Sequence, residues 1–170
     1  MPSLHVCPLS RLPDTIAASG ASHLVTLVTP GSAVERPAEI SPEHHLRVAF
    51  SDIVAPLDGH RPPGEEHVRA VLDFVQAWPR ENPMVIHCYA GISRSTAAAF
   101  AAACALRPDR DEAALAHELR RRAPSATPNR LFVAIADRLL GRAGRMSAAV
   151  SGIGRGAEAF EGTPFRLDLE

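Results

Sequence analysis

Four short runs of apolar and β-branched residues have the length and composition of β-strands. They are LHVCPLS (4–10), HLVTLVTP (23–30), HLRVAF (45–50) and MVIHC (84–88). The second run stops at Pro30 and Gly31, a pair that commonly ends a strand. The fourth is apolar apart from its histidine, which is typical of a central strand that is buried on both faces.

Apolar residues at helical spacing appear between these runs. Pro13 opens the first predicted helix and Gly20 closes it. A second predicted helix begins at Glu65, and its apolar face is made of Val68, Val71, Leu72, Val75 and Trp78. Strands that alternate with helices predict an α/β domain with a mostly parallel central sheet flanked by helices.

Three more helices are predicted in the second half of the chain. Residues 94–106 are apolar nearly all round, which is typical of a helix buried in the core, and their alanines would let it lie close to a sheet. The other two helices span residues 111–122 and 128–140. For the last of them we expect Thr127 as the N-cap and Pro128 at the first helical position.

The composition is that of an ordinary globular protein. The chain has 170 residues, of which 46% are hydrophobic and 22% charged, so it can form one domain with a sizeable core. A net charge of -1 argues against nucleic acid as a partner. All 18 lysine-or-arginine positions hold arginine, which fits a GC-rich bacterial genome.

The cysteines and the N-terminus indicate the compartment. Cys7, Cys88 and Cys104 form no C-x-x-C pair, as expected for a protein kept in a reducing cytosol. The N-terminus lacks the apolar core of a signal peptide, and the longest apolar run, AAAFAAACAL, has 10 residues, about half of a bilayer span. We therefore expect a cytoplasmic protein with no membrane partner.

The segment HCYAGISRS (87–95) joins the fourth predicted strand to a helix. Cys88 would end the strand, and Arg94, six residues later, would begin the helix. Backbone N–H groups of such a loop can point at one centre and bind a tetrahedral anion, and Gly91 tolerates the backbone angles of a sharp turn. Arg94 adds a planar fork that can hold two phosphate oxygens. The pattern therefore predicts a phosphate-binding loop.

The same loop predicts an activated thiol. A free thiol has a pKa of about 8.5, whereas a thiol at a helix N-terminus near a cation can fall to roughly 3.5–7.5. Cys88 would then be a thiolate nucleophile at the floor of the phosphate site, and His87 and Ser95 could assist it by hydrogen bonds. This chemistry needs no metal, and we expect no cofactor.

The pattern H-C-x-x-G-x-x-R-S resembles the signature of the cysteine-dependent protein tyrosine phosphatases, most closely the dual-specificity branch. The resemblance implies that Cys88 forms a phosphocysteine and that Ser95 eases departure of the thiolate in the hydrolysis step. It also implies a set of residues that bind the phosphoryl group through backbone amides and the guanidinium. They are Tyr89, Ala90, Gly91, Ile92, Ser93 and Arg94.

A second stretch, RAPSATPNRLF (122–132), resembles the R-P-x-x-x-P-N-x-x-F segment of dual-specificity phosphatases, with Ala123 inserted before the proline. In that family the asparagine, here Asn129, supports the phosphate loop. Together with the aspartate-containing loop that lies before Cys88, the two motifs cover roughly residues 45–140.

The domain organisation follows from this coverage. We expect a phosphatase-like catalytic domain over residues 1–145 and a C-terminal extension, 146–170, packed on that domain or trailing from it. Within the extension, GIGRG (152–156) lacks the G-x-G-x-x-G spacing and follows no strand. We interpret it as a flexible joint.

Two aspartates are candidates for the general acid that the family places on a loop before the cysteine. Asp52 lies 36 residues ahead of Cys88, directly after the strand that ends at Phe50. Asp58 lies 30 residues ahead, in the turn PLDGHRPP, which resembles the D-x-x-x-P loops of some relatives. We favour Asp52 because a strand can aim the residue that follows it, and we keep Asp58 as the alternative.

These residues predict a phosphatase for protein phosphotyrosine, with phosphoserine and phosphothreonine as further substrates. The partner would be a phosphorylated protein or a small phosphomonoester, and free phosphate or sulfate would occupy the same site. Two alternatives are a catalytically weak or dead phosphate-binding module and a phosphatase for a phosphoinositide or an RNA 5′ phosphate. A sulfur transferase of the rhodanese kind also uses a loop cysteine, but C-x5-R-S indicates phosphate.

Overall fold

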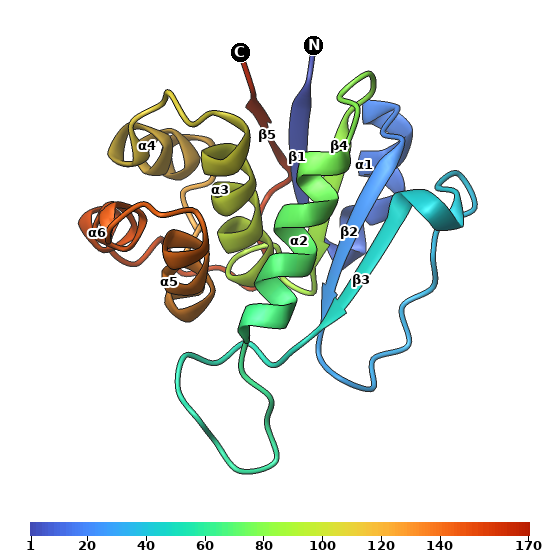
Figure 1. Cartoon of the computed structure of the whole chain (residues 1–170). Helices are drawn as coiled ribbons and strands as arrows, with labels where there is room; N and C mark the ends of the chain where they lie inside the picture. The colour runs from blue at the N-terminus through green and yellow to red at the C-terminus, as the bar shows by residue number, and fades with distance from the viewer.

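Five strands form a single mixed sheet in the order β3-β2-β4-β1-β5 (Figure 1). The computed structural model describes residues 1–170, and its strands are β1 Ser3–Pro8, β2 His23–Val28, β3 His45–Ala49, β4 Met84–Cys88 and β5 Phe165–Asp168. The pairs β1–β4, β2–β4 and β2–β3 are parallel, and only β5 runs antiparallel to β1. The predicted mostly parallel sheet and the four predicted strands are confirmed, and β5 is an addition.

Six helices cover the sheet. They are α1 Leu12–Ser19, α2 Glu65–Ala77, α3 Arg94–Leu106, α4 Glu112–Arg122, α5 Arg130–Leu139 and α6 Arg145–Ile153, with short 3-10 turns at Leu9–Arg11 and Pro42–His44. Helix α1 packs on β1 and β4 from one side, whereas α2 and α3 lie on the other side against β3, β4 and β1 (Figure 1). Helices α4 and α5 pack against α3, and α6 packs against α4 and α5 as an outer layer. None of the helices is long and apolar enough to span a membrane.

Helix α3 connects the predicted phosphate loop to the core. Every residue of it except Ala105 is buried, as the all-round apolar pattern predicted. Its alanines let the helix lie against β4 and β1 on one side and accept α2, α4 and α5 on the others. The loop that precedes α3 therefore starts from a strand and ends on a helix that are both fixed in the core.

Helix α5 begins two residues later than predicted. Asn129, rather than Thr127, is the N-cap, because its Oδ1 accepts a hydrogen bond of 3.0 Å from the N–H of Phe132. The hydroxyl of Thr127 instead donates to the carbonyl of Ser125 and accepts from the N–H of Gly156. The predicted cap was wrong: the hydroxyl of Thr127 is engaged by Ser125 and by the distant Gly156.

The C-terminal residues complete the fold. Helix α6 is capped by a side chain from outside it: the buried carboxylate of Asp137 accepts hydrogen bonds from the N–H groups of Gly144, Met146 and Ser147. GIGRG, predicted as a flexible joint, ends α6 and leads into a segment that returns to β5. This helix and this strand were not predicted, because a remote carboxylate and the edge of β1 determine them.

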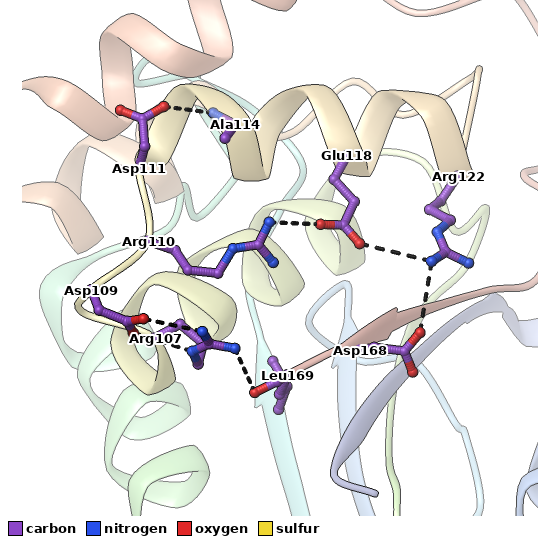
Figure 2. Close-up of polar contacts among 9 residues, drawn as sticks. All are labelled: Arg107, Asp109, Arg110, Asp111, Ala114, Glu118, Arg122, Asp168 and Leu169. Carbon is purple, nitrogen blue, oxygen red and sulfur yellow. Dashed lines mark hydrogen bonds and ion pairs between the residues drawn. The ribbon is translucent and has the colours of Figure 1, made fainter.

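Polar contacts hold the end of β5 against α4 and the loop before it (Figure 2). Arg122 lies 3.6 Å from the carboxylate of Asp168, and Arg107 donates to the carbonyl of Leu169 over 2.9 Å. Glu118 lies between Arg110, at 3.0 Å, and Arg122, at 3.8 Å. The last strand is therefore attached both to β1 and to the helical layer.

Candidate active site

The predicted phosphate loop lies at the carboxyl end of β4, between that strand and α3. Cys88 is the last residue of β4 and Arg94 the first of α3, as the sequence predicted. Gly91 has φ of 67°, and a Cβ at this position would lie 2.7 Å from the backbone nitrogen of Pro8. Both the left-handed backbone angle and the contact with β1 therefore require glycine.

The sulfur of Cys88 lies inside this loop and is nearly buried, with 3% of the residue exposed. The N–H of Gly91 donates to Sγ over 3.2 Å, and Oγ of Ser95 lies 3.1 Å from Sγ. The Ser95 hydroxyl can accept from a thiol or turn to donate to a thiolate. The loop thus offers the sulfur two hydrogen-bond partners.

The carbonyl groups of the loop are held from outside by backbone N–H donors of distant segments. The four bonds are Leu9 to Tyr89 (3.0 Å), Gly162 to Ala90 (2.7 Å), Thr127 to Ile92 (2.9 Å) and Asn129 to Ser93 (3.2 Å). Because a trans peptide places its C=O and N–H on opposite sides, each outward carbonyl turns the next N–H inward. The amides of Ala90, Gly91, Ser93 and Arg94 are therefore directed toward the interior of the loop, an arrangement that binds anions.

Arg94 forms one wall of the site. Its Nη1 donates to Oγ1 of Thr29 and to the carbonyl of Phe50, both at 3.1 Å, so the residues that directly follow β2 and β3 hold the guanidinium. Its Nε is buried and has no hydrogen-bond partner in the protein. An unpaired charged donor in a buried position is costly, and an anion in the loop would satisfy it.

The cavity above Cys88 has a volume of about 460 Å³. Cys88 and Arg94 line it together with Val28, Val34 and Tyr89. A charged floor with largely apolar walls suits a phosphate group carried on an apolar or aromatic stem.

The two candidate acids differ in their contacts with the phosphate loop. Oδ1 of Asp52 accepts hydrogen bonds from Oγ of Ser93 (2.7 Å) and from Nδ2 of Asn129 (2.9 Å), so this carboxylate is attached to the rim of the phosphate loop. Neither bond uses Oδ2. Asp52 lines a neighbouring hollow of about 450 Å³ rather than the cavity over Cys88. Asp58 is exposed in the turn between β3 and α2, and no hydrogen bond or ion pair joins it to the loop.

Asn129 therefore has more contacts than the sequence indicated. It caps α5, binds Asp52, donates to the carbonyl of Ile53 and, through its backbone N–H, holds Ser93. Ser93, predicted only as a phosphate-binding residue, also links the loop to Asp52. The roles of Leu9, Thr29 and Gly162 were missed, because no local pattern marks a residue whose partner is far away in the sequence.

His87 is fully buried beneath the loop. Its Nε2 lies 2.9 Å from Oγ1 of Thr26, which also lies 2.9 Å from Nε2 of His45 on the edge strand. Burial lowers the pKa of His87 from 6.5 to about 4. The side chain is therefore neutral near pH 7 and supports the loop as part of a polar chain across β4, β2 and β3.

We expect the protein to lose stability as the pH falls from 6.5 toward 4. In this window the unfolded chain protonates His87 and the folded protein does not, so the free energy of unfolding decreases by about 3 kcal/mol from this residue alone. Urea unfolding of the wild type and of His87→Gln at pH 7, 5.5 and 4 measures the difference. The variant should lose less stability across the window; equal losses would contradict the assignment.

The three cysteines differ in position and chemistry. Cys7 packs with α1 on one face of the sheet, whereas Cys88 belongs to the core on the other face. Burial raises the pKa of Cys7 to about 11 and that of Cys104 to about 12. No three His, Cys, Asp or Glu side chains converge as ligands for a metal ion.

No model of a known protein family matches the sequence, and no curated protein matches it. Solved structures do match the fold. DUSP15 gives a TM-score of 0.61 at 18% identity over 89% of this chain and 92% of that chain, and human DUSP28 gives 0.61 at 18% over 82% and 92%. A mouse putative dual specificity phosphatase complexed with zinc tungstate gives 0.56 at 19% over 80% and 79%. The predicted architecture is thereby confirmed: the chain has the fold of the dual-specificity and related protein tyrosine phosphatases.

Proposed function

We propose that the protein is a cysteine-dependent phosphatase that hydrolyses phosphomonoesters through a phosphocysteine intermediate. The observation that carries the proposal is the cradle around Cys88: inward amides, a sulfur within the loop, and a buried Nε of Arg94 without a protein partner. The amides and the guanidinium can bind the phosphoryl oxygens, and the sulfur can attack the phosphorus atom. The mouse structure of this fold, a complex with zinc tungstate, adds support because tungstate is a tetrahedral oxyanion.

The reaction takes two steps. The Cys88 thiolate attacks phosphorus, the P–S bond forms, and the ester P–O bond breaks as the carboxyl group of Asp52 gives its proton to the leaving oxygen. Water then attacks the phosphocysteine and passes a proton to the Asp52 carboxylate. The P–S bond breaks, Ser95 donates to the returning thiolate, and phosphate leaves.

The substrate that fits best is a phosphorylated protein, with phosphotyrosine as the reacting residue. The apolar walls of the cavity above Cys88 support an aromatic stem, and phosphoserine or phosphothreonine would place fewer apolar atoms against them. Small aryl phosphates should react for the same reason. We place the residues that carry the reaction within 1–145, and the remaining residues supply most of α6 and the strand β5 to the same fold.

Turnover of 4-nitrophenyl phosphate tests the proposal directly. Hydrolysis should persist in the presence of a chelator and be blocked by orthovanadate. Binding of phosphate without any turnover would favour the phosphate-binding module instead. Parallel assays on phosphopeptides, phosphoinositides and 5′-phosphorylated RNA would decide the substrate class, and a preference for either of the last two would overturn the protein-phosphatase assignment.

We also expect peroxide to inactivate the enzyme reversibly. Peroxide oxidises the thiolate form of a cysteine to sulfenic acid, and Cys7 packs with the core on the opposite face of the sheet from Cys88. Residual activity should fall with peroxide, return with dithiothreitol, and be protected by inorganic phosphate. If inactivation is equally fast with the phosphate site filled, the oxidised residue is not Cys88.

A further inference from the structure

Residues 154–164, which we call the C-terminal strap, run from the end of α6 to the start of β5 and pass outside the phosphate loop. The strap contacts the rest of the protein near both ends. At its start, the N–H groups of Gly156 and Ala157 donate to Oγ1 of Thr127 and to the carbonyl of Pro124. Near its end, the N–H of Gly162 donates to the carbonyl of Ala90 over 2.7 Å. Between these points a hollow of about 760 Å³ lies next to Ile92 and Ser93.

Two glycines let the strap approach other backbone segments at these contacts. A Cβ on Gly162 would lie 2.6 Å from the carbonyl oxygen of Gly91 in the phosphate loop. A Cβ on Gly156 would lie 2.6 Å from the carbonyl carbon of Ser125. Both obstacles are backbone atoms, so a side chain cannot be accommodated by a change of rotamer. Close approach to the loop therefore depends on glycine.

Gly162 and the sulfur of Cys88 bind the two polar groups of a single peptide unit. Gly162 holds the C=O of the Ala90–Gly91 peptide from outside, and the N–H of the same peptide donates to Sγ of Cys88 over 3.2 Å. The group is planar, so rotating the carbonyl away from the strap would rotate the N–H away from the sulfur. The hydrogen bond from Gly162 thus fixes the direction of a donor that the thiolate and a bound phosphoryl group both use.

Arg120 anchors the start of the strap. Its guanidinium donates to the carbonyls of Ile153 (2.7 Å), Gly154 (2.6 Å) and Ala126 (2.9 Å). Ala126 precedes Thr127, whose N–H holds the carbonyl of Ile92. One side chain therefore ties the strap to the turn that supports the other half of the phosphate loop.

We propose that Gly162 is a positioning residue for the phosphate loop: the C-terminal strap holds the Ala90–Gly91 peptide so that its N–H faces Cys88. The inference rests on the proposed function of this site, because it assigns the strap a part in stabilising the thiolate and the bound phosphoryl group. It gives the C-terminal extension a role in the chemistry that the sequence did not indicate.

The test compares Gly162→Ala with Gly152→Ala, a control in α6 where an added Cβ would meet no atom within 4 Å. We expect Gly162→Ala to raise the pH midpoint of Cys88 alkylation by iodoacetamide by about one unit and to weaken orthovanadate binding about ten-fold, the effect of losing one hydrogen bond to a charged group. Gly152→Ala should match the wild type in both the alkylation midpoint and the affinity for orthovanadate. The alkylation midpoint is measured without turnover, so it tests the strap even if the protein proves not to be a phosphatase.

A second pair of variants tests the same proposal if Gly162→Ala does not fold. Arg120→Ala releases the start of the strap, and Arg121→Ala removes the neighbouring exposed arginine. Arg120→Ala should shift the alkylation midpoint and vanadate affinity in the same directions, and Arg121→Ala should shift neither. A lower melting temperature with an unchanged midpoint and unchanged vanadate affinity, in whichever strap variant folds, would make the strap merely structural and overturn the proposal.

Discussion

Replacing Cys88 by serine should reduce hydrolysis of aryl phosphates by roughly 10⁴–10⁶-fold, the range seen when an enzyme loses one residue of its catalytic machinery. A serine hydroxyl is a much poorer nucleophile than a cysteine sulfur, for which the amide of Gly91 and the hydroxyl of Ser95 are placed as hydrogen-bond partners. The loop amides and Arg94 remain, so inorganic phosphate should still bind. Initial rates with 4-nitrophenyl phosphate and calorimetric phosphate titration measure the two effects.

The matched control for this experiment is Cys104→Ala. Cys104 lies fully buried in α3, and burial raises its pKa to about 12, so it takes no part as a nucleophile. The control should retain most of the activity per folded molecule. Full turnover in Cys88→Ser would exclude the phosphocysteine mechanism, and loss of phosphate binding in that variant would show that the sulfur itself is part of the binding site.

Asp52→Asn should slow hydrolysis of phenyl phosphate by roughly 10²–10⁴-fold and that of 4-nitrophenyl phosphate far less. A phenolate with a pKa of about 10 needs a proton to leave, whereas nitrophenolate leaves without one. The substitution is nearly isosteric, and an amide oxygen can still accept the hydrogen bonds from Ser93 and Asn129. The rim of the loop should therefore stay intact while the proton donor is lost.

Asp58→Asn is the matched comparison. Asp58 is exposed in the turn after β3 and makes no hydrogen bond or ion pair with the phosphate loop, so we expect rates close to the wild type on both substrates. The pH profile adds a second criterion, because the true acid's variant should lose the limb at which activity falls as the acid deprotonates. If Asp58→Asn alone shows the dependence on the leaving group, the proline-rich turn supplies the acid and the assignment of Asp52 is wrong.

The conformation of the loop could be predicted from the sequence because it is local. HCYAGISRS contains the end of a strand, a turn and the start of a helix within nine residues, so the spacing of Cys88 and Arg94 determines that both face one centre. The positive backbone angle at Gly91 is likewise a property of one residue. The four parallel strands and the buried helix α3 follow from apolar patterns of the same short range.

The support of that loop could not be predicted, because it depends on segments far apart in the sequence. Leu9, Thr127 and Gly162 hold three loop carbonyls through backbone N–H groups, which carry no residue-specific signal. Asp137 caps α6 from another helix, and Asn129 rather than Thr127 caps α5 because Thr127 is engaged elsewhere.

The residues that we propose for the reaction are thus recognisable from the sequence, and their orientation depends on the tertiary structure. A short motif places a thiol and a guanidinium on one turn, since covalent geometry limits where neighbouring residues can go. The direction of each loop amide depends on what the carbonyl of the same peptide group binds. Those partners reach the loop only when the turn after β1, the turn before α5 and the C-terminal strap pack around it. Hydrogen bonds between such distant segments leave no periodicity in the chain, so only the folded protein decides them.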